Sequence, residues 1–416
     1  MKTVIMAGGK GTRISSIASD IPKPMIKIGD KPVLELEIES LKKQGLIDFI
    51  ITISHLGHVI SDYFGDGSKF GVNIEYYNEE IPLGNAGALF ELKDKLKEDF
   101  LLVNGDVLFD IDVNRFLDFH REKNGLVSIF THPNTHPYDS GLVITDKNDC
   151  VIKWLTKEDN RPEYYKNRVN AGIHIVSPKV LEERPDKEKI DLDRDILKPL
   201  CGKDEMYAYD SPEYVKDMGT PERYAEVSRD YLSGKVSRRN LCNKQKAIFL
   251  DRDGTINKYV GFLRNINDFE LLENTAEAIH RINDSDYLAI VVSNQPVIAR
   301  GEVTFEELDE IHNKMETLLG KKGAYLNRIY FCPHHPDSGF EGEVKELKIE
   351  CNCRKPKPGM LYQAAKDFNI DLTESFMIGD SNNDVEAGKA AGCSTIKIDT
   401  DGDLLEAVNK VLEYKI

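Results

Sequence analysis

Two apolar runs in this chain each end abruptly in glycine or charged residues. The first lies within residues 1–13 (MKTVIMAGGKGTR) and passes into a glycine-rich, basic loop. The second lies within residues 247–255 (AIFLDRDGT) and ends in two aspartates one residue apart. A short apolar run bounded in this way is typical of a strand buried in a parallel sheet. Because ligands bind beyond the carboxyl ends of such strands, the chain is expected to carry two strand-end sites.

Length and composition favour a folded chain of two or three domains. The 416 residues include 40% hydrophobic and 30% charged side chains, as is usual for soluble proteins. The net charge of −16 disfavours nonspecific binding of nucleic acid or an anionic membrane. The sequence shows no apolar run of the roughly 20 residues that span a bilayer, no signal-peptide pattern and no dense cysteine framework. We therefore expect a cytoplasmic protein without nucleic-acid or membrane partners.

Strand-like apolar runs alternate with amphipathic helical stretches along the chain. The expected strands are residues 4–7, 49–54, 101–106, 247–251, 287–294, 328–332 and 376–380. The expected helices are residues 33–44, 273–283, 304–319 and 358–368. This alternation predicts an α/β fold of two domains, each a mainly parallel sheet with flanking helices.

A change in composition separates the two series. Residues 234–246 (GKVSRRNLCNKQK) carry five basic residues and no acidic one, and a new strand follows directly. Such a stretch is typical of a solvated connector between domains. We therefore predict a first domain over residues 1–232, a basic linker over 233–246 and a second domain over 247–416.

The first strand-end loop has the composition of a phosphate-binding loop. Its glycines allow backbone N–H groups to approach phosphate oxygens, and its threonine and arginine add donors. These residues are Gly8, Gly9, Gly11, Thr12 and Arg13. The loop matches neither the Walker nor the dinucleotide-binding pattern, and two tight turns with incidental basic residues remain the alternative. A rigid turn at Pro22–Met25 presents Lys23 nearby in the sequence.

Six segments of residues 1–230, in this order, resemble the sugar-1-phosphate nucleotidylyltransferase family. They are AGGKGTR (7–13), PKPM (22–25), PLGNAGAL (82–89), NGDVL (104–108), NAGIHI (170–175) and DMGTPERY (217–224). The resemblance implies that a sugar 1-phosphate oxygen attacks the α-phosphorus of a nucleoside triphosphate and that pyrophosphate leaves. The segment is most similar to mannose- and heptose-1-phosphate guanylyltransferases, which implies GTP as the donor.

The same resemblance implies roles for individual residues. Arg13 would stabilise the leaving pyrophosphate, and Lys23 would lie beside the reacting phosphates. Asp106 and Asp217 would hold Mg²⁺, which prefers carboxylate and phosphate oxygens. The base and ribose would face Leu83, Gly84 and Asn85, and the sugar phosphate would contact Gly141, Lys157, Asn170 and Gly172. The family more often has threonine in place of Asn85, and the match around Lys157 is looser.

The second strand end carries paired carboxylates. Asp251 and Asp253 can share a site with a metal ion, the first attacking a phosphate and the second exchanging protons with the leaving oxygen and with water. The DxDG pattern also occurs in calcium loops, but the rest of that pattern is absent. Further polar residues follow in order, namely Ser293 and Asn294 at a strand end, Lys355 in RKPKPGM and Asp380 in MIGDSNND.

This ordered set resembles the haloacid dehalogenase superfamily of phosphatases. SNQPVIARG (293–301), CPHHP and CNCRKPKPGM are similar to its heptose-bisphosphate and histidinol-phosphate phosphatase branch. The resemblance implies that Asp251 is the nucleophile and Asp253 the general acid and base. Phosphate would be bound by Ser293, Asn294 and Lys355, substrate by Arg354, and Mg²⁺ by Asp380, Asp251 and the Asp253 carbonyl.

Two departures from that branch concern the substrate and the metal. Pro296 and Val297 stand where a Ser-Gly turn is usual, so the loop facing the substrate is expected to differ. Ser381 stands where a basic residue is usual, which makes Asp384 a candidate second carboxylate.

Two pairs of soft ligands precede Lys355. Cys332 and His334 form one pair, and Cys351 and Cys353 form the other. Three thiolates and an imidazole suit tetrahedral Zn²⁺, and a shell made only of protein ligands implies a structural site. His335 is the rival ligand, and reduced surface cysteines or a redox pair are the other interpretations.

Together the two resemblances predict a bifunctional enzyme that makes a nucleotide-activated heptose for a surface polysaccharide. The second domain would remove the 7-phosphate of D-glycero-D-manno-heptose 1,7-bisphosphate, and the first would join heptose 1-phosphate to GMP from GTP. The alternatives are another sugar or base, a phosphatase for histidinol phosphate, and one catalytically silent domain. The expected partners are small-molecule nucleotides and sugar phosphates. The sequence leaves the oligomeric state open, a homodimer included.

Overall fold

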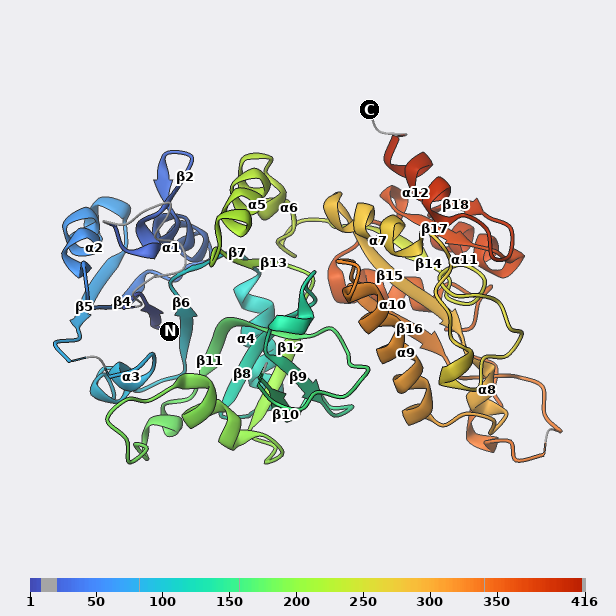
Figure 1. Cartoon of the computed structure of the whole chain (residues 1–416), viewed down its shortest axis with the longest axis horizontal. Coiled ribbons are helices and arrows are strands. Elements are labelled where there is room, and N and C mark those ends of the chain that lie inside the picture. Colours follow the sequence, from blue (N-terminus) through green and yellow to red (C-terminus); the bar gives the residue numbers. More distant parts are fainter. Residues whose placement is uncertain (9–20, 82, 157, 340, 414–416) are drawn as a thin grey trace. The chain divides into compact units, whose positions relative to one another are not determined.

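The computed structural model describes residues 1–8, 21–81, 83–156, 158–339 and 341–413 (Figure 1). The chain forms two compact units. Unit 1 comprises Met1–His132, Leu142–Leu155 and Asn170–Asn240, and unit 2 comprises Pro133–Gly141, Thr156–Val169 and Leu241–Ile416. Two segments from the first half of the chain therefore belong to unit 2, which no sequence pattern indicated.

Unit 1 is built on a nine-stranded mixed sheet. Its parallel part is β5-β4-β1-β6, formed by β1 (Thr3–Met6), β4 (Asp48–Ile53), β5 (Asn73–Asn78) and β6 (Phe100–Asn104). The other strands are β8 (Val127–His132), β9 (Leu142–Thr145), β10 (Val151–Leu155), β11 (Val169–Val176) and β12 (Met206–Asp210). β11 runs antiparallel to β6, so the sheet changes direction beside the strand that leads to Asp106.

Both faces of this sheet are buried, which explains why its strands are apolar throughout. Successive strand residues face opposite sides, so Val4 packs into one core and Ile5 into the other. The Val4 side includes α3 (Gly87–Glu91), and the Ile5 side includes α1 (Val33–Lys43), α2 (Gly57–Phe64) and α4 (Val113–Lys123).

Two small antiparallel pairs and two helices complete unit 1. The pairs are β7 (Val107–Asp110) with β13 (Tyr214–Asp217), and β2 (Lys27–Ile28) with β3 (Lys31–Pro32). Thr220 caps α5 (Pro221–Leu232) by accepting the Arg223 N–H. The expected linker contains α6 (Lys235–Arg238), whose Val236 is buried, and Asn240 donates to Asp110 at 2.7 Å. Part of this basic stretch is thus folded onto unit 1.

Unit 2 contains a five-stranded, fully parallel sheet in the order β16-β15-β14-β17-β18 (Figure 1). The strands are β14 (Lys246–Leu250), β15 (Tyr287–Asn294), β16 (Arg328–Cys332), β17 (Phe376–Gly379) and β18 (Ser394–Lys397). One face packs against α7 (Thr275–Asp284), α9 (Phe305–Gly320) and α12 (Leu404–Glu413). The other face packs against α10 (Gly359–Phe368) and α11 (Asn382–Ala391), and α8 (Pro296–Ala299) follows β15.

The predicted fold class is confirmed, because each unit has a sheet with a parallel core and flanking helices. β15 and β16 have the predicted bounds, and the other predicted elements agree to within a few residues. Among the helices of the described ranges, none has the length and apolarity needed to cross a membrane.

Candidate active sites

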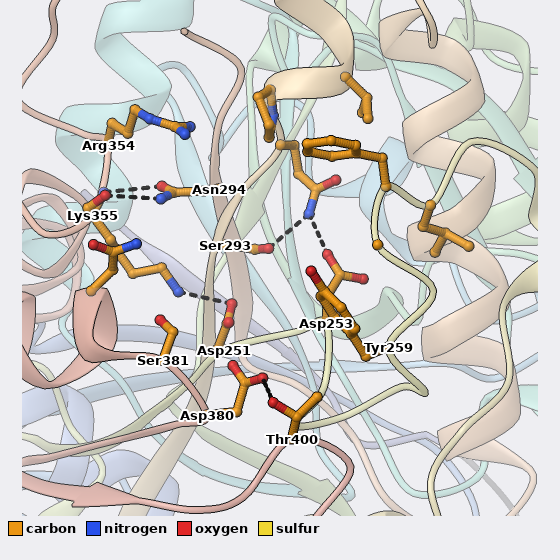
Figure 2. A pocket seen from close by; sticks show the side chains of 17 residues that line it. Asp251, Asp253, Tyr259, Ser293, Asn294, Arg354, Lys355, Asp380, Ser381 and Thr400 are labelled. Carbon is orange, nitrogen blue, oxygen red and sulfur yellow. Dashed lines mark hydrogen bonds and ion pairs between the residues drawn. The ribbon is translucent and has the colours of Figure 1, made fainter.

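The polar residues of unit 2 gather at the carboxyl ends of three neighbouring strands (Figure 2). Asp251 directly follows β14, Ser293 and Asn294 end β15, and Asp380 directly follows β17. Since β14 lies between β15 and β17, these side chains meet at one edge of the sheet. They line a pocket of about 450 Å³ together with Asp253, Arg354 and Lys355.

A buried lysine joins two carboxylates at the base of this pocket. Lys355 is 3% exposed, and its Nζ lies 2.8 Å from Asp251 Oδ1 and 2.5 Å from Asp384 Oδ1. Burial alone would lower the pKa of Lys355, but the two carboxylates outweigh it and raise the pKa above its usual value. Burial raises the pKa of Asp251 to about 7, and the opposing attraction of Lys355 limits the rise.

Three carboxylates of this site fit a hard divalent cation. Oxygens of Asp251, Asp380 and Asp384 lie within 4.8 Å of one another. Asp384 is fully buried, and its second oxygen accepts the N–H and Oγ–H of Ser381 at 3.0 and 2.6 Å. Gly254 keeps the space beside Asp380 open, because its φ is +81° and an added Cβ would lie 2.6 Å from Asp380 Oδ2. An all-oxygen donor set of this kind suits Mg²⁺.

Asp253 accepts hydrogen bonds from three neighbouring side chains. Arg252 donates to both of its oxygens, Gln295 to Oδ2 at 2.9 Å and Asn257 to Oδ1 at 3.1 Å. Burial would raise the pKa of Asp253, but the charge of Arg252 and these donors outweigh it and lower the pKa below its usual value. Sequence reasoning missed Arg252 and Gln295, although an arginine between the two aspartates at a strand end was a visible signal.

The amide of Asn294 has a structural role. Its Nδ2 donates to the Lys355 carbonyl at 2.9 Å, and its Oδ1 accepts the Lys355 N–H at 3.0 Å (Figure 2). Its side chain therefore positions the lysine, whereas Ser293 lines the pocket as expected of a phosphate ligand.

An apolar wall faces these polar groups, and sequence reasoning missed its two aromatic residues. It consists of Tyr259, Phe262, Pro296 and Val297. Tyr259 and Phe262 are 53% and 42% exposed, and the Arg300 guanidinium lies 4.4 Å from the Phe262 ring centre. The departures from the family pattern at positions 296 and 297 thus lie in the pocket itself.

The four predicted zinc ligands form one cluster, with all four ligand atoms within 4.8 Å of one another. The sulfur of Cys353 lies 3.2 Å from those of Cys332 and Cys351, and 3.3 Å from His334 Nδ1. These separations are too long for disulfides and close to the roughly 3.8 Å edge of a tetrahedron around Zn²⁺. His335 points its Nδ1 at the Asp337 N–H instead. The donor set fits a structural Zn²⁺.

Removal of a metal bound by this cluster is expected to destabilise unit 2 and to disturb the adjacent pocket, because Cys353 lies two residues before Lys355. Incubation with a zinc chelator, or the Cys351→Ser substitution, should lower the melting temperature by several degrees and release about one zinc per chain. Metal content and calorimetry measure both effects, and Cys242→Ser at an exposed cysteine is the matched control. Purified protein without zinc that melts at the same temperature would contradict the prediction.

In unit 1, the loop after β6 and the end of β13 bring two carboxylates together. Val107 pairs with Asp217 across the β7–β13 ladder, and the Met218 N–H donates to the Asp106 carbonyl at 3.3 Å. Lys23 forms an ion pair with Asp106. Burial would raise the pKa of Asp217, but Arg223, at 2.9 Å, is the main influence that lowers it. Lys23 also helps to lower the pKa of Asp217, so the three predicted residues are neighbours. Carboxylates are the donor type that Mg²⁺ prefers, and a Mg²⁺ site here stays a prediction.

The predicted base-binding loop is shaped by contacts with Ile190. Gly84 has a φ of +89°, and an added Cβ would lie 2.3 Å from the Ile190 carbonyl oxygen. Leu83 accepts the Ile190 N–H at 2.8 Å through its own carbonyl. Asn85 Oδ1 accepts the Leu192 N–H at 2.7 Å, so this exposed side chain ties the loop to the segment that follows Ile190.

The predicted sugar-phosphate residues flank the same sheet. Asn170 Oδ1 accepts the Gly172 N–H at 3.0 Å and lies 3.1 Å from His174 Nε2. Gly172 lies against Asn104, two residues before Asp106, and Gly141 directly precedes β9. Gly8 lies just beyond β1, where its carbonyl accepts the Ser54 hydroxyl at 2.6 Å. Five predicted residues, Gly9, Gly11, Thr12, Arg13 and Lys157, lie outside the described residues.

Comparison with known families and proteins assigns the two halves of the chain to different families. Residues 2–234 match the nucleotidyl transferase family, and residues 352–413 match the HAD-hydrolase-like family. A crystal structure from Bacillus anthracis, described as a glucose-1-phosphate thymidylyltransferase, shares the fold of the first half. Its TM-score is 0.50 at 19% identity, over 55% of this chain and 94% of that one.

Two curated relatives resemble different halves. Mannose-1-phosphate guanylyltransferase of Mycobacterium tuberculosis is 33% identical over 234 residues, which are 56% of this chain and 64% of that protein. D-glycero-beta-D-manno-heptose-1,7-bisphosphate 7-phosphatase of Yersinia pestis is 42% identical over 149 residues, which are 36% of this chain and 77% of that protein. The chain therefore spans just under two thirds of the first relative and about three quarters of the second.

Proposed function

The chain belongs to the nucleotidyl transferase family through residues 2–234 and carries a HAD-like phosphatase domain after it, and from this premise we propose that it makes GDP-D-glycero-D-manno-heptose in two steps. The second half removes the 7-phosphate of heptose 1,7-bisphosphate. The first half then transfers GMP from GTP to heptose 1-phosphate and releases pyrophosphate. The observation that carries this proposal is the 42% identity of the phosphatase half to a heptose-bisphosphate phosphatase, joined in one chain to a relative of a guanylyltransferase.

The phosphatase half has a group for each step of ester hydrolysis. The Asp251 carboxylate attacks the phosphorus of the 7-phosphate while the C7 oxygen leaves and takes a proton from Asp253. Water then attacks the aspartyl phosphate, Asp253 accepts the proton of that water, and inorganic phosphate departs. A phosphate dianion beside Asp253 favours the protonated form that the first step needs, and Lys355 balances the charge on Asp251.

Magnesium would be held by Asp251, Asp380 and Asp384, and it would supply positive charge against the phosphate oxygens. Asp384 is the candidate second carboxylate named from the sequence, and its oxygen lies within 4.8 Å of those of Asp251 and Asp380. The Asp253 carbonyl stays a proposed further ligand.

The transferase half offers positive charge and carboxylates where a triphosphate would react. An oxygen of heptose 1-phosphate attacks the α-phosphorus of GTP, and the bond to pyrophosphate breaks. Lys23 lies beside the reacting phosphates, and Asp106 and Asp217 would hold a second Mg²⁺ that neutralises the triphosphate. Asn170 and Gly172 contact the incoming sugar phosphate. Catalysis here consists of positioning and charge neutralisation, because the protein makes no covalent bond.

A direct test supplies purified protein with heptose 1,7-bisphosphate and each nucleoside triphosphate in turn. We expect inorganic phosphate in every reaction, but pyrophosphate and a nucleotide sugar only with GTP. Mass spectrometry identifies the product, and NMR identifies its anomer. Absence of pyrophosphate from heptose 1-phosphate and GTP would contradict the transferase half, and preferred hydrolysis of histidinol phosphate would contradict the phosphatase half.

A further inference from the structure

A closed hydrogen-bond network lies behind the phosphatase pocket, around an arginine that no proposed step uses. The Arg252 side chain is 0% exposed. Its Nη2 donates to Asp253 Oδ2 at 2.8 Å and to Gln295 Oε1 at 3.0 Å, and its Nη1 lies 3.3 Å from His312 Nε2. A buried guanidinium is costly unless its donors are satisfied, and here the donors of Arg252 converge on Asp253, Gln295 and His312.

Gln295 connects this arginine to the substrate side of the pocket. It is 2% exposed, and its Nε2 donates to Asp253 Oδ2 at 2.9 Å and to Ser293 Oγ at 2.8 Å. Its Oε1 accepts from Arg252, which fixes the orientation of the amide. Both amide protons are therefore committed, one to the proposed acid and one to the proposed phosphate ligand.

His312, on α9, closes the network on the far side. Since Arg252 is a donor, the facing Nε2 of His312 must be an acceptor, and the ring is neutral. Burial and then the charge of Arg252 lower the pKa of His312 to about 3, in agreement with that neutral form. The ring lies 5.6 Å from the Phe331 ring, so packing also restrains it.

We propose that Arg252 and Gln295 are positioning residues, which together hold the Asp253 carboxyl toward the leaving oxygen of the phosphate ester. Arg252 holds the Asp253 carboxyl from the side away from the pocket. Gln295 links the same carboxyl to Ser293 by donating to both. Proton donation to the leaving oxygen needs this alignment, because a general acid acts only within hydrogen-bond reach of the atom it protonates. The inference rests on the proposed phosphatase function and adds the residues that make Asp253 effective.

The test compares Gln295→Met with wild-type full-length protein on phosphate monoesters whose leaving groups range from sugar alcohols to 4-nitrophenol. Methionine keeps the size of glutamine but makes none of the three hydrogen bonds of its amide. A poor leaving group depends on proton donation, whereas 4-nitrophenolate leaves without it. We therefore expect kcat to fall about 30-fold for sugar phosphates and less than about 3-fold for 4-nitrophenyl phosphate, with KM little changed. A plot of log kcat against leaving-group pKa should become steeper.

Ser293→Ala is the matched control, because it removes the other partner of Gln295 and should lower the rates of all esters by a similar factor. Arg252→Lys keeps the charge but loses the forked geometry, and it should show the same steepening. An equal loss on all esters for Gln295→Met, or no loss at all, would overturn the proposal. If wild-type protein hydrolyses other alkyl phosphates but not heptose 1,7-bisphosphate, the assigned substrate fails while the slope still tests the positioning role.

Discussion

Asp251→Asn is expected to abolish phosphate release and to leave pyrophosphate release from GTP and heptose 1-phosphate unchanged. An amide cannot form the aspartyl phosphate, so the loss in kcat should exceed about 10⁴-fold. The substitution keeps the shape of the side chain, and Lys355 keeps its contact with Asp384 at 2.5 Å, so the buried lysine retains one carboxylate. The fold should therefore survive.

Colorimetric assays of phosphate and pyrophosphate on the same preparation measure both activities. Asp399→Asn is the matched control, because it makes the same charge change at an exposed aspartate just before Thr400 at the pocket. Residual phosphatase activity above a few per cent in Asp251→Asn would show that another group is the nucleophile. Parallel loss of nucleotidyl transfer would show instead that the substitution damages the whole chain.

Asp106→Asn should produce the opposite pattern. Asp106 is the ion-pair partner of Lys23 and a proposed Mg²⁺ ligand, so its loss removes several kcal/mol of charge stabilisation. That corresponds to a decrease in nucleotidyl transfer of about 10³-fold, with phosphatase activity intact. Thermal stability should change little, because this carboxylate is 40% exposed.

The measurement is GDP-sugar formation from supplied heptose 1-phosphate, followed over a range of Mg²⁺ concentrations. A weakened metal site should raise the Mg²⁺ concentration that gives the half-maximal rate. A purely steric defect would lower the rate but leave that concentration unchanged. Asp118→Asn, at an aspartate 77% exposed on α4, is the control for loss of one negative charge. Unchanged transfer in Asp106→Asn would remove Asp106 from the metal site and overturn the assignment carried over from the family.

The parallel strands were predictable because their apolar runs are buried on both faces. β15 and β16 follow from YLAIVVSN and RIYFC without tertiary information. The pairing of β7 with β13 was not predictable. In the sequence, 103 residues lie between Asp110 and Tyr214, and no local pattern specifies so distant a partner. The same holds for α6, whose four residues lie in a basic stretch and gain their stability from packing around Val236.

Strand-end motifs indicated most of the residues that gather in the two sites, but not what their side chains contact. The spacing of Cys332, Cys351 and Cys353 left two histidines as candidates. In the structure His334 joins the sulfurs, whereas His335 Nδ1 accepts the Asp337 N–H. The letters around Asn294 suggested a phosphate ligand, whereas its amide is engaged by the Lys355 backbone. These side-chain contacts depend on where another segment of the chain lies, and the residues next to a motif do not determine that position.

The phosphatase pocket divides into positions that resist change and positions that tolerate it. A side chain at Gly254 would collide with Asp380, and Lys355 is enclosed by two carboxylates. Tyr259 and Phe262, by contrast, stand on a half-exposed loop that contributes shape and little charge. Substitutions in this apolar wall can therefore change which ester the pocket accepts while the catalytic residues stay the same. Related enzymes could in this way evolve from one sugar substrate to another through intermediates that all remain active.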